Sequence, residues 1–104
     1  MFGWSVLVPY SLPLSKSHRQ AGWKAKIHDL ERLEPPHVTI YFRMRKWRLS
    51  LRTATFLDRG DKWSQIEKGV REAIEGAWTT LQTEWDRIHP DNPVQGQEDD
   101  NNDQ

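Results

Sequence analysis

Residues 22–56, GWKAKIHDLERLEPPHVTIYFRMRKWRLSLRTATF, alternate apolar and polar side chains with a period of two along most of their length. Such alternation is typical of antiparallel strands that pack one face on a core and leave the other in water. We predict three strands, at about 22–30, 37–43 and 47–56. The predicted core face carries Trp23, Ala25, Ile27, Val38, Ile40, Phe42, Trp47, Leu49 and Leu51.

The connections between these strands predict a β-meander. The segment Glu31 to Pro36 ends in two prolines, which disfavour both a helix and ladder hydrogen bonds, and Arg43 to Lys46 suits a four-residue hairpin loop. These loop lengths predict a register in which Ile40 pairs with Ile27 on one side and with Leu49 on the other.

After residue 61 the apolar period becomes that of an α-helix. We predict one long helix over about 65–88, with a capping box that begins at Ser64 and a stop at Pro90. Its apolar stripe comprises Ile66, Val70, Ala73, Ile74, Ala77, Trp78, Leu81, Trp85 and Ile88. Such a helix is roughly 36 Å long, whereas a seven-residue strand spans only about 23 Å. We therefore expect its end to overhang the sheet, covered by the N-terminal segment or by a second protomer of a homo-oligomer.

Together these elements predict an α+β fold: a three-stranded antiparallel meander packed against one long C-terminal helix. Residues 1–19 form an apolar segment and a polar linker (Ser15 to Arg19), with an extra edge strand expected around Trp4 to Val8. Residues 20–90 form the single domain. Residues 91–104 are acidic and lack any apolar period, which predicts a disordered tail.

Composition narrows the classes of function. Cysteine is absent, which excludes disulfides and thiolate zinc sites, and no run approaches the ~18 apolar residues that span a bilayer. The apolar N-terminal stretch lacks the basic start and small-residue cleavage site of a signal peptide. We therefore expect a cytoplasmic protein with no membrane association and no cofactor.

The formal net charge of zero conceals two halves of opposite sign. Residues 1–56 hold ten Lys and Arg against three Asp and Glu, net +7, and residues 57–104 hold five against twelve, net −7. This polarity predicts an anionic partner for the first half, or pairing of the two halves.

The predicted register places the basic residues in rows on the open face of the sheet. The first row is Lys24, Arg43 and Lys46, and the second is Lys26, Tyr41 and Arg48. The third is His28, Thr39 and Ser50, and the last is His37 and Arg52. An aromatic ring flanked by cations suits a stacked base and its phosphates. The predicted nucleic-acid-binding residues are Lys24, Lys26, Tyr41, Arg43, Lys46, Arg48 and Arg52.

Two histidines on this face are candidate catalytic residues. His28 and His37 are expected as diagonal neighbours about 7–8 Å apart. They would bracket a scissile phosphate as acid and base, with Arg52 stabilising the developing charge, which is the chemistry of a metal-free ribonuclease. Metal binding is not expected, because no histidine pair has ligand spacing.

A resemblance to a known family lies in about residues 22–90. It is carried by Leu33-Glu34-Pro35-Pro36-His37-Val38-Thr39-Ile40 and by the helix end Leu81-Gln82-Thr83-Glu84-Trp85. These resemble a small bacterial domain of unknown function, in which a Pro-Pro-His-aromatic-His-Val motif opens a strand and a helix ending near Glu-Asn-Trp closes the domain. His37 matches the first motif histidine, and Thr39 stands at the second. Some members look like components of toxin–antitoxin pairs, so the resemblance implies this fold and an RNA-related role.

We therefore favour a binding module for RNA or another polyanion over an enzyme. Two alternatives stay open. One is a toxin-type metal-free ribonuclease, and the other is a protein-interaction subunit whose basic half meets an acidic partner.

Overall fold

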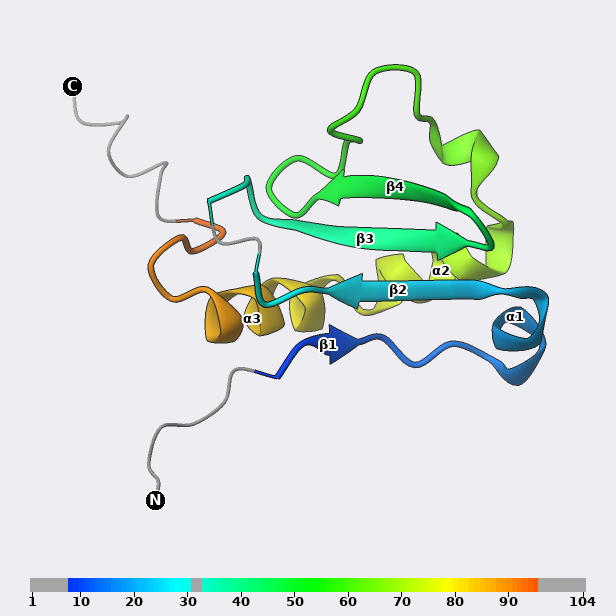
Figure 1. Cartoon of the computed structure of the whole chain (residues 1–104), viewed down its shortest axis with the longest axis horizontal. Coiled ribbons are helices and arrows are strands. Elements are labelled where there is room, and N and C mark those ends of the chain that lie inside the picture. Colours follow the sequence, from blue (N-terminus) through cyan, green and yellow to red (C-terminus); the bar gives the residue numbers. More distant parts are fainter. Residues whose placement is uncertain (1–7, 31–32, 96–104) are drawn as a thin grey trace.

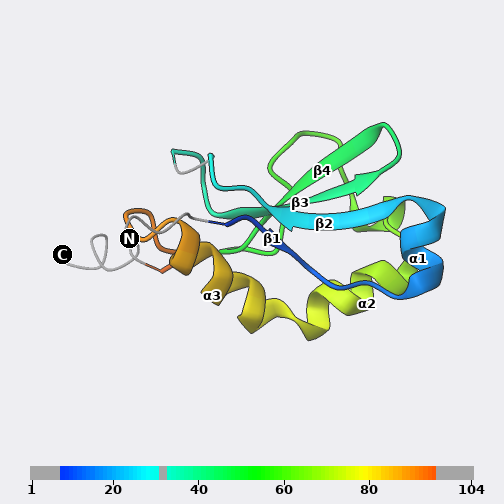
Figure 2. The same cartoon turned by 60° about the horizontal axis from the view of Figure 1, so that its bottom comes forward.

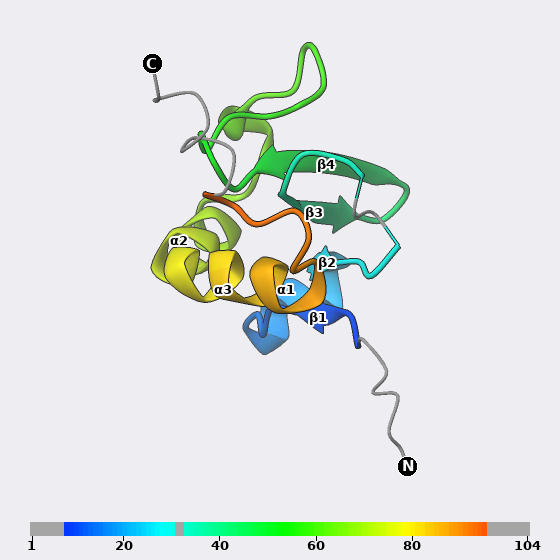
Figure 3. The same cartoon turned by 90° about the vertical axis from the view of Figure 1, so that its left-hand side faces the viewer.

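An antiparallel sheet and two helices form the two layers of the fold, as the computed structural model shows for the described residues 8–30 and 33–95 (Figure 1). The strands lie in chain order: β1 (Tyr10–Ser11), β2 (Trp23–Ile27), β3 (His37–Phe42) and β4 (Arg45–Ser50). The helices are α1 (Lys16–Ala21), α2 (Lys68–Gly76) and α3 (Trp78–Ile88). Figures 2 and 3 show α2 and α3 together on one side of the sheet, so the opposite side is an open face. The predicted α+β class and meander are confirmed, with four strands in place of three.

The core lies between the sheet and the α2–α3 layer. Every side chain predicted for the core face is buried except Phe42, which is half-buried. Near the β3–β4 turn, Trp23 stacks on Phe42 and on Trp47, with ring centroids 4.4 and 5.8 Å apart. The guanidinium groups of Arg43 and Arg45 lie over Phe42 and Trp47 at 4.9 and 4.7 Å, so a cation covers each end of this aromatic stack.

The predicted register is wrong by two residues on both sides of β3. Ile40 pairs with Ala25 on β2 and with Trp47 on β4. The β4 side shifts because the β3–β4 loop has two residues, Arg43 and Met44, rather than four, and the β2 side shifts because the β2–β3 connection begins at residue 28 rather than 31. Since the period of a strand is two, this shift leaves every side chain on its predicted face. It changes only which side chains are neighbours across the strands.

The predicted single helix is two helices that bend at Ala77. The Ala77 amide donates to the carbonyl oxygens of both Ala73 and Ile74, each at 3.2 Å, and its own φ and ψ of −108° and 19° leave the helical range. The bend changes the direction of the helical layer, and the end of α3 still reaches past the ends of the strands in Figure 1. Both halves of the apolar stripe are buried within the chain: Val70, Ile74, Leu81, Trp85 and Ile88.

The predicted helix start at Ser64 is also wrong. Trp63–Gln65 form a 3₁₀ turn, Ile66 is extended, and α2 begins only at Lys68. The Gln65 side chain explains the turn, because its Oε1 accepts hydrogen bonds from Trp47 Nε1 at 2.9 Å and from the Lys62 amide at 3.0 Å. A tertiary contact with the core therefore replaces the predicted capping box.

The N-terminal segment contributes the edge strand, but not at the predicted place. β1 lies between Pro9 and Pro13, which cannot donate ladder hydrogen bonds and so limit the strand to two residues. Of the predicted strand Trp4 to Val8, only Val8 lies within the described residues, and it is not in a strand. Leu12 and Leu14 are buried in the core, so this part of the segment packs within the chain.

The predicted polar linker is the helix α1. Ser15 caps its first turn by accepting from the His18 amide, and Gly22 ends it in the left-handed region at φ 111°. His18 attaches α1 to α2, because its Nε2 lies 2.6 Å from a carboxylate oxygen of Glu67. Its ring also rests on Gly69, where a Cβ would lie only 2.4 Å from the imidazole.

The start of the predicted disordered tail is packed. Val94 is 2% exposed, and the Asn92 carbonyl accepts from Trp85 Nε1 at 2.7 Å. Arg52 donates to the carbonyl oxygens of Val94 and Pro93 at 2.6 and 2.9 Å. The prediction of disorder is therefore wrong for residues 92–95, because the buried Val94 and the half-buried Arg52 hold them. The rest of the predicted tail lies outside the described residues.

Replacing Gly22 with alanine should lower the free energy of unfolding by about 1–2 kcal/mol, because φ 111° is costly for any L side chain. The new Cβ would also lie 3.2 Å from Arg43 Cγ. Urea denaturation measures the loss. Gly76→Ala is the control, since nothing lies within 4 Å of its Cβ and the helix favours alanine. Equal stabilities of the two variants would contradict this account of the cap.

Candidate nucleic-acid interface

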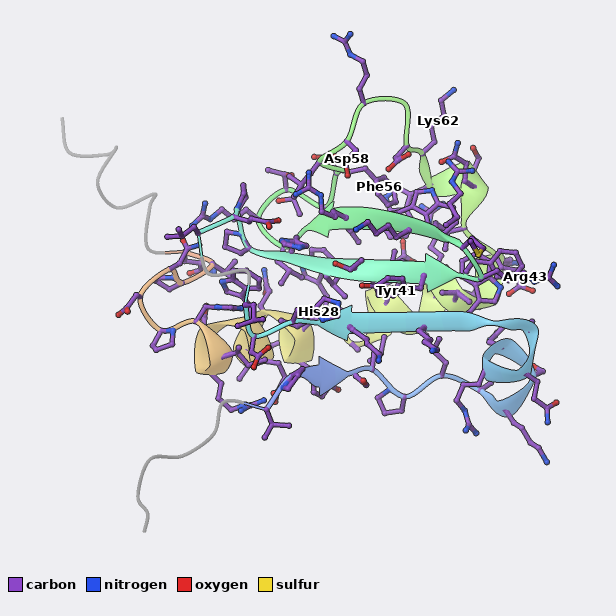
Figure 4. All side chains as sticks on the ribbon, viewed as in Figure 1. His28, Tyr41, Arg43, Phe56, Asp58 and Lys62 are labelled. Carbon is purple, nitrogen blue, oxygen red and sulfur yellow. The ribbon has the colours of Figure 1, made fainter. Side chains whose placement is uncertain are left out.

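A basic groove runs along the open face over β2 and β3. Strand alternation places Lys24, Lys26 and Tyr41 on this face, because their neighbours fill the core. The groove has a volume of about 390 Å³, and its lining is Gly22, Lys24, Lys26, His28, Tyr41 and Arg43. In Figure 4, His28 and Tyr41 lie over the middle of the sheet and Arg43 lies at the hairpin end. Lys24, Lys26 and Tyr41 lie within strands, and Gly22, His28 and Arg43 lie directly beside strand ends, so the strands position the groove.

A hydrogen bond between His28 and Tyr41 closes one end of the groove. His28 Nε2 lies 2.7 Å from the Tyr41 hydroxyl, and the two rings meet edge to face with centroids 5.9 Å apart. Tyr41 pairs across the sheet with Lys24, and His28 lies four residues after Lys24 in the chain. The tyrosine side chain therefore leans along the strand to reach the histidine.

The cations of the groove have no carboxylate partners within the part of the chain that the structure describes. Among residues 8–30 and 33–95, no ion pair joins Lys24, Lys26 or Arg43 to an acidic side chain. Arg43 is exposed and sits in the left-handed region at φ 56°, where its amide donates to the Gly22 carbonyl. The groove thus concentrates positive charge that is open to an anionic ligand.

The β4 side of the open face is electrostatically different. Arg48 donates from Nε and Nη2 to the two carboxylate oxygens of Asp58, at 3.0 and 2.7 Å, and from Nη1 to Glu34 Oε1 at 2.8 Å. This bidentate bond holds the pKa of Asp58 below its usual value of 3.8 and raises that of Arg48. The charge of Arg48 is therefore balanced within the chain.

The corrected register changes the predicted rows. Tyr41 lies between Lys24 and Lys46, and not between Lys26 and Arg48, which instead flank Thr39. Of the predicted binding residues, the structure gathers Lys24, Lys26, Tyr41 and Arg43 in the groove. Lys46 is exposed beside Tyr41, in the neighbouring hollow of the β4 side.

Two candidate catalytic residues lie elsewhere. His37 is fully buried, with Nδ1 2.8 Å from the Pro35 carbonyl oxygen and its ring 5.5 Å from that of Trp85. Arg52 binds the carbonyls of residues 93 and 94. His28 alone of the three lies in the groove. The partner that sequence reasoning missed is Tyr41, because the contact joins residues in different rows of the sheet.

A membrane-spanning helix and a metal-binding cluster are both absent from the described part of the chain. No helix there is long and apolar enough to cross a membrane. No group of three His, Asp or Glu side chains in residues 8–30 and 33–95 is arranged to hold a metal ion.

Comparisons of the chain with protein-family models, with curated proteins and with solved structures give no match.

The Arg48–Asp58 bond predicts a loss of stability in acid. The Asp58 carboxylate stabilises the folded state above its unfolded pKa near 3.8, and this contribution disappears as the pH falls through the lower folded pKa. Between about pH 5 and pH 2 the parent should lose up to about 1 kcal/mol more than Asp58→Asn, a small effect because Asp58 is 47% exposed. Urea denaturation at both pH values measures it. If Asp58→Asn changes the acid-induced loss of stability by the same amount in an Arg48→Gln background, the Arg48–Asp58 bond is not the cause.

Proposed function

We propose that the chain binds single-stranded RNA through the basic groove. The observation that carries this proposal is the position of Tyr41, a partly exposed ring on a strand, among Lys24, Lys26 and Arg43 in one groove. Proteins that bind single strands combine a cationic track for the backbone with aromatic rings on which bases stack.

The charges of the groove support an anionic ligand. Lys24 and Lys26 lie on β2 and Arg43 lies in the β3–β4 turn, and all three line the same groove rather than separate patches. Neutralising phosphates with such cations releases counterions, which gives affinity that falls with salt. The chain has a net charge of zero, and the groove is a small part of its surface. The separation of cations from anions therefore concentrates the attraction for an anion in the groove.

The aromatic ring supports a single strand rather than a duplex. Only unpaired bases expose a face that can stack on tyrosine, and a duplex is bound through its shape and backbone. The hydrogen bond between His28 and Tyr41 holds the tyrosine hydroxyl at one end, which limits the motion of the ring before a base arrives. A groove of about 390 Å³ is within the range of small-molecule sites, which suits one or two nucleotide units.

A labelled octauridylate should bind the parent with an affinity that decreases steeply as salt rises. Lys24→Gln and Lys26→Gln should each reduce the slope of log affinity against log salt by about 0.7. Tyr41→Ala should cost about 1–3 kcal/mol of binding free energy with little change in slope, whereas Tyr41→Phe, which keeps the ring, should lose much less. Fluorescence anisotropy across a salt series measures all four variants.

Lys68→Gln is the matched control for charge, since Lys68 is an exposed lysine on α2, behind the sheet. It should leave both affinity and slope nearly unchanged. Equal effects of Lys68→Gln and Lys24→Gln would show that net charge, and not the groove, governs binding. Salt-sensitive binding of polyglutamate without binding of octauridylate would favour the interaction subunit with an acidic partner.

The His28–Tyr41 hydrogen bond favours one second function, a metal-free ribonuclease. In this reaction His28 Nε2 accepts the 2′-hydroxyl proton as the 2′-oxygen attacks phosphorus, and Tyr41 donates its proton to the departing 5′-oxygen. The products are a 2′,3′-cyclic phosphate and a 5′-hydroxyl. The 2.7 Å contact then returns the proton from His28 to Tyr41, and the groove cations stabilise the charge on the phosphoryl oxygens.

Mass spectrometry of an RNA oligomer incubated with the parent tests this second function by looking for the cyclic phosphate. His28→Gln and Tyr41→Phe should each lower the cleavage rate at least 100-fold, because proton transfer typically supplies a factor of this size. Tyr41→Phe should still bind RNA. Intact RNA after incubation with the parent, or unchanged cleavage by both variants, would show that the groove only binds.

A further inference from the structure

A second row of side chains lies beside the groove and is not used by the proposed function. Thr39 pairs with Lys26 on β2 and with Arg48 on β4, so the three residues form one line across the open face. Lys26 also lines the basic groove, which makes the row continuous with it.

The Thr39 hydroxyl is a buried polar group without a partner. Thr39 is 2% exposed, and among the described residues no group forms a hydrogen bond with its Oγ1. Burying a hydroxyl in this way is unfavourable, and nearly all buried polar atoms have a partner. On a face whose flanking residues are cations, this unused donor and acceptor suits the oxygen of an anion.

Arg48 already holds oxygen atoms in the geometry that phosphate would take. Three of its guanidinium nitrogens donate to carboxylate oxygens, two to Asp58 and one to Glu34, at 2.7–3.0 Å. A guanidinium fork matches carboxylates and phosphates equally well. The two acidic side chains therefore occupy the positions in which phosphate oxygens would bind.

These ion pairs are accessible enough to exchange. The side chains of Arg48, Asp58 and Glu34 are 31%, 47% and 40% exposed, and exposed ion pairs contribute little to stability. They border a hollow of about 450 Å³, whose lining is Glu34, Lys46, Arg48, Asp58 and Asp61. Lys46 adds a further cation there, on the same strand as Arg48, so an anion that replaced the carboxylates would meet two positive charges of β4.

We propose that Lys26, Thr39 and Arg48 form a second phosphate subsite, which Asp58 and Glu34 close in the free protein. It opens when a phosphate of the bound RNA replaces the two carboxylates on Arg48 and accepts a hydrogen bond from the Thr39 hydroxyl. This inference rests on the proposed function, since the RNA that occupies the groove brings the phosphate next to Lys26. The acidic residues thus set the affinity of the basic face.

Asp58→Asn tests the closure. Loss of the competing carboxylate should tighten binding of labelled octauridylate about two- to fivefold, which corresponds to the usual strength of an exposed ion pair. Glu72→Gln is the matched control, because it makes the same change of charge at an exposed residue of α2, on the opposite side of the sheet. Equal tightening by both variants would show a general charge effect and would overturn the proposal.

Thr39→Val tests the hydroxyl. Valine has the same shape and lacks the unpartnered group, so the variant should unfold at a higher temperature than the parent while binding octauridylate about threefold or more weakly. A variant that is more stable but binds more weakly would show that the hydroxyl contacts the ligand rather than supporting the fold. Unchanged affinity with raised stability would mean that the hydroxyl contacts no ligand.

Failure of the subsite and failure of the proposed function give different results. If Lys24→Gln weakens octauridylate binding but Asp58→Asn and Thr39→Val do not change it, the groove binds RNA and the subsite is wrong. If the parent does not bind octauridylate, the proposed function is wrong, and a pyrophosphate titration followed at the Arg48 Nε resonance decides the subsite. A saturable shift that Thr39→Val weakens would retain it as a phosphate site, and no shift would overturn it.

Discussion

The burial of one face of β2, β3 and β4 against α2 and α3 is the constraint on which the rest of the molecule depends. Trp23, Ile40 and Leu49 must point into the core, so the residues between them must point out. The same backbone that buries an apolar row therefore presents Lys24, Tyr41 and the other polar residues in an ordered row. Because packing against the helices fixes these strands, the open face is a rigid surface, and its charges are positioned before any ligand arrives.

The helical layer meets this constraint by bending. The bend at Ala77 divides the apolar stripe between α2 and α3, and both halves are buried within the chain. The indole of Trp85 then joins distant parts of the chain, because it contacts the rings of His37 and His89 and donates to the Asn92 carbonyl. His89 in turn lies 2.7 Å from the His28 carbonyl oxygen, which ties the end of β2 to the end of α3.

Positive and negative charges are separated both along the chain and across the open face. The chain as a whole is neutral, and the first half carries the positive excess. Within that half, the structure separates cations that acidic side chains neutralise, such as Arg48, from those of the groove, which have no such partner among the described residues. The acidic loop after β4 supplies Asp58 and Asp61 to the basic face, so part of the negative second half shields part of the positive first half.

The sequence by itself determined the class of fold, the core and the faces. Period-two alternation marks which side chains of β2–β4 are buried, and a register error of two residues cannot change that answer, since it preserves parity. This is why the basic character of the open face, with Lys24, Lys26, Tyr41 and Arg43 on it, was predictable. The sequence also signals the short helix α1, with a serine cap and a glycine stop separated by six residues, but its polar composition obscured this signal.

Only the tertiary structure decided which of these residues are neighbours and which are available. Cross-strand partners depend on the true lengths of both connections of β3. The two-residue β3–β4 turn pairs Tyr41 with Lys46 in place of Arg48, and the longer β2–β3 connection pairs it with Lys24 in place of Lys26. The pairing of Arg48 with Asp58, the burial of His37 and the contact of Arg52 with residues 93 and 94 join segments that are distant in sequence or packed under others. Local patterns report the environment of a residue along its own strand, whereas the availability of a charge depends on which other segments fold against it.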